Sequence, residues 1–130
     1  MSDTEEADEI AKNVCFLSEN VSLKAIAVFS NSTTTLPSIS RHRPNVPIWS
    51  ISSDISRVRQ DSIFRGVKTY HMQYLSDDRD ESIYKAIQTI YTYGELELTD
   101  KIAIISGSSI KNKKTDSILE IVTVKDILNS

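Results

Sequence analysis

Short apolar runs alternate with stretches of helical periodicity along the chain, and this alternation constrains the fold more than any other feature of the sequence. Five runs have the length and apolar content of strands, and they cover residues 25–29, 46–52, 67–72, 102–106 and 118–124. A helical pattern precedes each of the first four runs. Such alternation predicts an α/β fold, in which a mostly parallel sheet lies between two layers of helices.

Two helical segments have the three- to four-residue apolar spacing of an amphipathic helix. Residues 4–19 place apolar side chains on one face, at Ile10, Val14 and Leu17. A longer stripe lies in the second half of the chain, at Ile83, Ala86, Ile87, Ile90 and Tyr91. Gly94 follows that stripe, and a glycine in this position is a typical helix stop.

Two shorter helices are predicted between the first three strands. Residues 34–42 contain Pro37, which a helix tolerates in its first turn, so we expect this helix to begin close to Leu36. Asp54 is a candidate N-cap for the next helix, and Gly66 is its stop. One face of that helix is expected to consist of Ile55, Val58, Ser62 and Ile63.

The last predicted strand, residues 118–124, follows a polar loop and no helix. A loop of about ten residues is short for a parallel crossover, so this strand is predicted to be antiparallel. We interpret residues 1–130 as one domain. The acidic head, residues 1–9, and the tail, residues 125–130, are expected to be its least ordered parts.

Composition excludes several classes of protein. The net charge of −3 and the lack of aromatic residues interleaved with basic ones argue against nucleic-acid binding. One cysteine allows no internal disulfide, and Cys15, His42 and His71 lack the spacing of a metal site, so we expect no metal and no cofactor. No apolar run approaches the roughly 20 residues of a membrane span, and the N-terminus is acidic and polar. These features favour a cytoplasmic protein without a membrane contact.

A hydroxyl-rich segment follows the first predicted strand and is the main candidate for a binding site. It consists of Ser30, Asn31, Ser32, Thr33, Thr34 and Thr35. Ligands of open α/β sheets bind at the carboxyl ends of the strands, where this segment and the loop after Ser106 are both expected. Hydroxyl and backbone N–H groups before a helix could bind a phosphate. Alternatively, Thr34 or Thr35 only caps the helix.

A second candidate is the basic cluster of the loop after Ser106, which consists of Lys111, Lys113 and Lys114. These side chains could attract the phosphate of a ligand, although three exposed charges give a weak attraction that salt screens. The alternative is a solvated lysine loop without a ligand, and we favour that alternative.

Other polar residues have simpler interpretations. Arg41 and Arg43 could hold a phosphate, but we favour a helix end or a subunit contact for them, and His42 is expected to pack. Cys15 is expected to be half-buried and inert. The acids at positions 77–81 precede a long helix, where capping is the expected role. Asp54 lacks the companion acids and lysine of a phospho-acceptor site.

The segment KAIAVFSNSTTTLPSISRHRPNVPIWSIS, residues 24–52, resembles the start of the pyruvate kinase C-terminal domain. That family has a strand, a Ser/Thr-rich loop, a helix and then an Arg-Pro-x-x-Pro-Ile motif, which matches Arg43, Pro44, Pro47 and Ile48. Further similarity lies in Arg59-Gln60, in Gly66-Val67, in GELELTDKIAIISG and in ILEIVTV. The resemblance covers about residues 7 to 124.

The resemblance implies a three-layer α/β/α sandwich with a mixed five-stranded sheet, strand order 3-2-1-4-5 and an antiparallel last strand. It also implies a non-catalytic domain that takes part in oligomerisation and, in many members, binds a sugar-phosphate effector such as fructose 1,6-bisphosphate. The catalytic barrel of that family, which requires about 250 residues, has no room in this chain. The implied partners are a phosphorylated effector, or a phosphate or sulfate ion, and either further copies of this chain or a catalytic pyruvate kinase portion.

The candidate loops depart from the family pattern at several positions. Thr33 stands where the family has glycine, and threonine resists the positive φ that glycine permits. Lys111 and Lys114 stand at glycine positions of the second loop. Two other functions stay open: an enzyme that acts on small phosphorylated molecules at the same edge, and a dimerisation module without a ligand.

Overall fold

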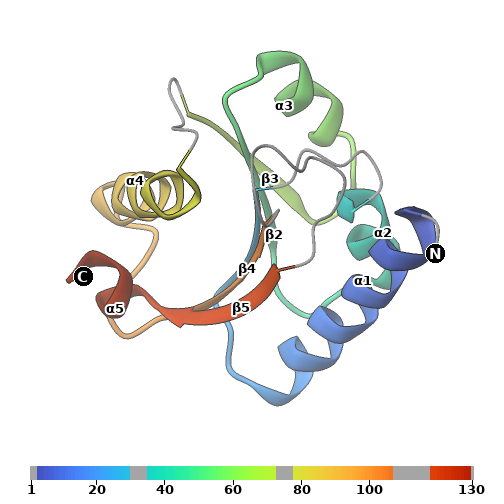
Figure 1. The fold of residues 1–130 in the computed structure, drawn as a ribbon, viewed down its shortest axis with the longest axis horizontal. Coiled ribbons are helices and arrows are strands. Elements are labelled where there is room, and N and C mark those ends of the chain that lie inside the picture. The colour runs from blue at the N-terminus through green and yellow to red at the C-terminus, as the bar shows by residue number, and fades with distance from the viewer. Residues whose placement is uncertain (1–2, 30–34, 73–77, 107–117, 130) are drawn as a thin grey trace.

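The computed structural model describes residues 3–29, 35–72, 78–106 and 118–129, which form one mixed sheet flanked by helices (Figure 1). The helices are α1 (Asp3–Asn20), α2 (Thr35–His42), α3 (Ile55–Asp61), α4 (Arg79–Thr92) and α5 (Val124–Leu128). The strands are β1 (Ala25–Phe29), β2 (Ile48–Ser52), β3 (Val67–His71), β4 (Lys101–Ser106) and β5 (Ile118–Thr123).

The five strands lie in the order β3-β2-β1-β4-β5. β1 pairs in parallel with both β2 and β4, and β2 pairs in parallel with β3. β5 is antiparallel to β4, with Ile104 opposite Glu120. The α/β class, the strand order and the antiparallel last strand are thus confirmed.

Two apolar cores lie on opposite faces of the sheet, because neighbouring residues of a strand point to opposite sides. Ile26 and Val28 of β1 face one core, which α1 and α2 cover with residues such as Val14 and Leu36. Ala25 and Ala27 face the other core, which α4 and α5 cover with residues such as Ile87, Ile90 and Val124. Figure 1 shows the two helical layers on the two sides of the sheet. β1 and β4 are buried on both faces, which explains their continuous apolar runs.

The stop signals and caps predicted from the sequence explain several boundaries. Gly94, directly after the C-cap of α4, has a φ of 83°, a left-handed conformation that favours glycine. Pro37 lies in the first turn of α2, as its missing N–H requires. Gly66 has a φ of 75° in the turn before β3.

Two features differ from the pattern read in the sequence. Ile63 was expected on the face of a helix, but α3 ends at Asp61 and the Ile63 side chain is 80% exposed. The apolar pattern with helical spacing therefore extends two residues past the end of α3. The chain also turns directly from β5 into α5, a helix that the sequence pattern did not predict. α5 exists because Val124 is fully buried against the α4 side of the sheet.

Candidate functional site

The carboxyl ends of β1 and β4, which the two candidate loops follow in the sequence, lie next to each other. Phe29, the last residue of β1, pairs with Ser106, the last residue of β4. The two predicted binding segments therefore leave the sheet side by side, since parallel neighbours lie about 4.8 Å apart. Ser30 to Thr34 and the cluster Lys111, Lys113 and Lys114 lie outside the described residues.

Thr35 is the one residue of the hydroxyl-rich segment that the structure describes. It is the first residue of α2, and its side chain is only 1% exposed. α2 is held at this point by Leu36 and Ile39, which are buried in the core shared with α1. The N-terminus of α2 is thus fixed next to the edge at which the candidate loops leave the sheet. A fixed helix N-terminus offers N–H groups and a positive dipole end to an anion.

Arg79 reaches the same edge from the first residue of α4. Its Nε donates a hydrogen bond of 2.7 Å to the Ser106 hydroxyl, and its Nη2 forms an ion pair with Glu120 of β5. Its Nη1 lies 3.0 Å from the Asp80 carboxylate. A guanidinium therefore lies at the carboxyl end of β4, against its last residue.

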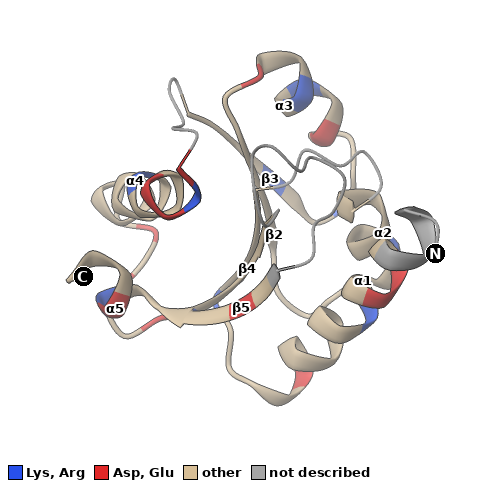
Figure 2. Ribbon diagram, in the orientation of Figure 1, with Lys and Arg blue, Asp and Glu red and all other residues tan. Residues whose placement is uncertain are grey.

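The sequence analysis did not predict a role for Arg79, because only the acids of this segment were considered. The available signal was a cation in a first helical turn, where acids are the favoured residues. Figure 2 shows acidic and basic positions together at this end of α4. Asp78 caps α4 by accepting from the N–H groups of Asp80 at 2.9 Å and Glu81 at 3.3 Å, so its predicted capping role is confirmed. Asp77 lies outside the described residues.

The ends of β2 and β3 carry local polar contacts. The Ser52 hydroxyl accepts from the Asp54 N–H at 3.0 Å, and Asp54 accepts from the Ser56 N–H at 2.9 Å as the N-cap of α3. His71 Nε2 lies 3.0 Å from the Ser53 carbonyl oxygen. The predicted capping role of Asp54 is thus confirmed.

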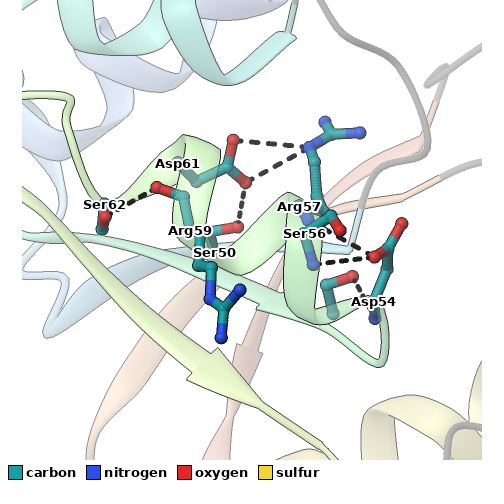
Figure 3. Close-up of polar contacts among 8 residues, drawn as sticks. Ser50, Asp54, Ser56, Arg57, Arg59, Asp61 and Ser62 are labelled. Carbon is teal, nitrogen blue, oxygen red and sulfur yellow. Dashed lines mark hydrogen bonds and ion pairs between the residues drawn. The ribbon is translucent and has the colours of Figure 1, made fainter.

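Beneath α3, a carboxylate is buried in a polar contact (Figure 3). The Ser50 hydroxyl of β2 donates to Asp61 Oδ2 at 2.5 Å, and Arg57 Nε lies 3.3 Å from the same oxygen. Ser50 and Asp61 are each 4% exposed. Sequence patterns do not predict this contact, because Ser50 and Asp61 belong to different elements.

The basic end of α2 contacts α1. His42 Nε2 lies 2.7 Å from Asp8 Oδ1, and Arg41 Nη2 lies 3.9 Å from the same atom. The hydrogen bond from His42, with help from Lys12, holds the pKa of the Asp8 carboxyl below its ordinary value. Half-buried His42 therefore makes a polar contact between two helices.

Cys15 is partly buried against the same core, and burial raises the pKa of its thiol. A raised pKa lowers the fraction of thiolate, which is the reactive form. The expectation of a half-buried, unreactive thiol is thus consistent with its surroundings.

A second polar cluster joins β3 to the end of α4. Glu95 accepts hydrogen bonds from Lys68 and from the Tyr70 hydroxyl, and Lys68 Nζ lies 5.1 Å from the centre of the Tyr70 ring. The Tyr70 ring meets Trp49 edge-on at 5.5 Å between centroids. The hydrogen bonds from Lys68 and Tyr70 lower the pKa of Glu95, and burial raises the pKa of Tyr70.

In the described part of the chain, no three His, Cys, Asp or Glu side chains lie close enough together to hold a metal ion. No helix among the described residues is long and apolar enough to span a bilayer.

The three-layer architecture and the polar edge define an α/β domain of the kind that places ligands at the carboxyl ends of parallel strands. Comparison with known protein families identifies the family of this domain. The model of the family described as pyruvate kinase, alpha/beta domain matches residues 8–122. The chain belongs to this family.

Individual relatives agree with the assignment. The chain is 34% identical over 90 residues to a pyruvate kinase of Schizosaccharomyces pombe, which corresponds to 65% of this chain and 18% of the relative. A crystal structure of a pyruvate kinase from Cryptosporidium parvum covers 92% of the chain with a TM-score of 0.75 and 22% identity. A structure of Cryptosporidium parvum pyruvate kinase in complex with ADP gives a TM-score of 0.78, also over 92% of the chain and at 22% identity. The chain spans 23% and 24% of those two structures, and at this identity they show the fold alone.

Proposed function

We propose that this domain is a non-catalytic regulatory and assembly domain, and that it binds a phosphorylated effector at the sheet edge between the loops after β1 and β4. One observation carries the proposal: Phe29 and Ser106 are paired, so the hydroxyl-rich loop and the lysine loop start next to each other. The nearby N-terminus of α2 and the Arg79 guanidinium add positive charge at this edge.

The ligand class follows from the groups available. Hydroxyls, backbone N–H groups, lysines and an arginine suit the oxygens of a phosphate ester or of a free phosphate or sulfate ion. A sugar phosphate is the proposed effector, since the family resemblance implies one. Neither cofactor nor metal is required for such binding.

A hydrolytic function at this edge is less favoured. Such a function needs a general base or a metal within reach of the ligand. Of the described acids near the strand ends, Asp54 and Asp78 are occupied as helix caps and Glu120 is paired with Arg79.

The proposed partners are other copies of this chain or a catalytic pyruvate kinase portion, in the cytoplasm.

The proposal is tested by thermal shift and titration calorimetry with inorganic phosphate, sulfate, sugar monophosphates and fructose 1,6-bisphosphate. A ligand that binds only the folded state raises the melting temperature in a saturable way. We expect Ser32→Ala to weaken this stabilisation. Thr92→Ala, which lies at the far end of α4 and whose hydroxyl bonds only to the Gln88 carbonyl oxygen within that helix, serves as control and should leave it unchanged.

The outcomes separate the alternatives. Absence of saturable stabilisation across the panel would refute the effector site. If the chain then still formed dimers or larger assemblies in sedimentation velocity, the ligand-free dimerisation module would be the better description. A strict monomer at high concentration would contradict the assembly role.

A further inference from the structure

We propose that α3 is a helix that opens independently of the rest of the domain, and that the buried contact of Asp61 with Ser50 and Arg57 is the catch that holds it closed. This inference does not depend on a bound effector. It rests on how α3 is attached to the sheet, which differs from the attachment of the long helices.

α3 has almost no apolar anchor. The only buried residue of Ile55–Asp61 is Asp61, an acid. The isoleucines within and just after the helix face solvent, with Ile55 46% exposed and Ile63 80% exposed. By contrast, α4 buries Ile83, Ile87 and Ile90, among others. Burial of apolar surface is the main force that holds a helix on a sheet, and α3 obtains little of it.

Polar contacts replace that force. The two oxygens of the Asp61 carboxylate lie 3.4 Å and 3.3 Å from Arg57 Nε, and the second also accepts the Ser50 hydroxyl at 2.5 Å. Figure 3 shows the carboxylate between the strand residue Ser50 and the helix residue Arg57. Ser50 is the only one of these three that belongs to the sheet. The catch thus ties the last residue of α3 to the middle of β2.

Such an attachment is conditional. A buried carboxylate is stable only while its partners are in place. When the site opens, water hydrates the carboxylate again, which offsets much of the free energy lost with its contacts. An apolar helix face gains no such favourable hydration when it is exposed to water. The free energy of opening should therefore be smaller for α3 than for α1 or α4, which makes α3 a separate unit of local unfolding.

The ends of the opening unit can be placed. On the N-terminal side it begins after Ser52, the last residue of β2. On the C-terminal side it ends before Phe64, whose side chain packs against the core shared by α1 and α2. Gly66 follows in a left-handed conformation that can serve as a pivot. Since α3 starts at the carboxyl edge of β2, its opening would change the same edge that carries the candidate effector loops.

Native-state hydrogen exchange of the 130-residue chain tests the proposal, and it needs no ligand. The amides of Val58 and Ser62, which donate to Asp54 and Val58 carbonyl oxygens, report on α3. We expect them to be protected at least roughly a hundredfold less than the amides of β1 and of α4, which open with global unfolding. Equal protection in α3 and β1 would overturn the proposal without any variant.

Variants then test the catch itself. Asp61→Asn removes the charge, and Ser50→Ala removes the hydrogen bond from the sheet, so each should lower α3 protection by about tenfold. Protection in α4 should change less than twofold. The controls are Asp126→Asn and Thr92→Ala, which alter exposed residues outside the opening unit and should leave α3 exchange unchanged. An equal loss of amide protection in α3 and α4 would show that Asp61 stabilises the whole domain and is not a catch for α3 alone.

Discussion

At the scale of single residues, polar side chains join elements that are distant in sequence. Glu95 connects to β3 through Lys68 and Tyr70, Asp8 connects α1 to α2 through His42, and Glu120 connects β5 to α4 through Arg79. These contacts are partly exposed, so each contributes modestly to stability. Their value lies in fixing the position of one element against another.

Glu95 gives a prediction for pH dependence. Lys68 and Tyr70 hold the pKa of its carboxyl below the ordinary value of 4.5, so the folded state binds a proton less readily than the unfolded state. The stability from Glu95 is therefore fully present above that ordinary value and is lost as pH falls through the lower pKa of the folded state.

We expect Glu95→Gln to be less stable than the parent chain in urea unfolding at about pH 7, and to approach its stability as pH falls below 4.5 and through the lower pKa of the folded state. Asp126→Asn, in which the altered carboxyl is exposed, is the control. A difference between parent and Glu95→Gln that stays constant over this range would contradict the assignment.

At the scale of elements, the helices differ in how they are held. α4 carries a complete apolar stripe, whereas α3 relies on Asp61 and leaves Ile63 in solvent. α5 is only five residues long, yet it exists because Val124 fills a place in the core. Burial, rather than helical spacing alone, therefore decides which of these helices contribute to stability.

Two isoleucine substitutions make this difference measurable. Ile87→Ala removes a fully buried side chain of α4 and should lower the free energy of unfolding by about 2–5 kcal/mol. Ile63→Ala, after α3, should change it by less than about 0.5 kcal/mol, because that side chain is 80% exposed. Chemical denaturation of both variants measures the two values. A large loss from Ile63→Ala would mean that the side chain is covered in solution, for instance by a second copy of the chain.

At the scale of the whole molecule, the chain is an α/β domain of the pyruvate kinase family, and residues 8–122 account for the match. The 130 residues are too few for the barrel of about 250 residues that carries out the chemistry in complete members. The described residues near the carboxyl edge of the sheet act as helix caps and ion pairs.

A direct consequence is that this chain alone should not convert phosphoenolpyruvate and ADP. A coupled assay for pyruvate measures this, with a complete pyruvate kinase as positive control. We expect no rate above the background without protein. Turnover that copurifies with the chain and is lost in a destabilised variant such as Ile87→Ala would contradict the non-catalytic assignment.

The sequence predicted most of the secondary structure, and the reasons are local. Ala25–Phe29 is apolar throughout because β1 is buried on both faces, and Asp54 and Asp78 cap helices as their positions indicated. The prediction for Ile63 was wrong because helical spacing says nothing about whether another surface covers the residue. The effector residues Ser30 to Thr34 and the three lysines stay predictions.

The sequence by itself determined the alternation of strands and helices, the strand that runs antiparallel and the helix caps, because these depend on residues near one another in the chain. Only the tertiary structure decided that Arg79 meets both Ser106 and Glu120, that Asp61 is buried against Ser50, and that α5 forms at Val124. The physical reason is that such contacts join residues on different elements. Their energy depends on burial and on the exact partner, which periodicity and composition do not encode.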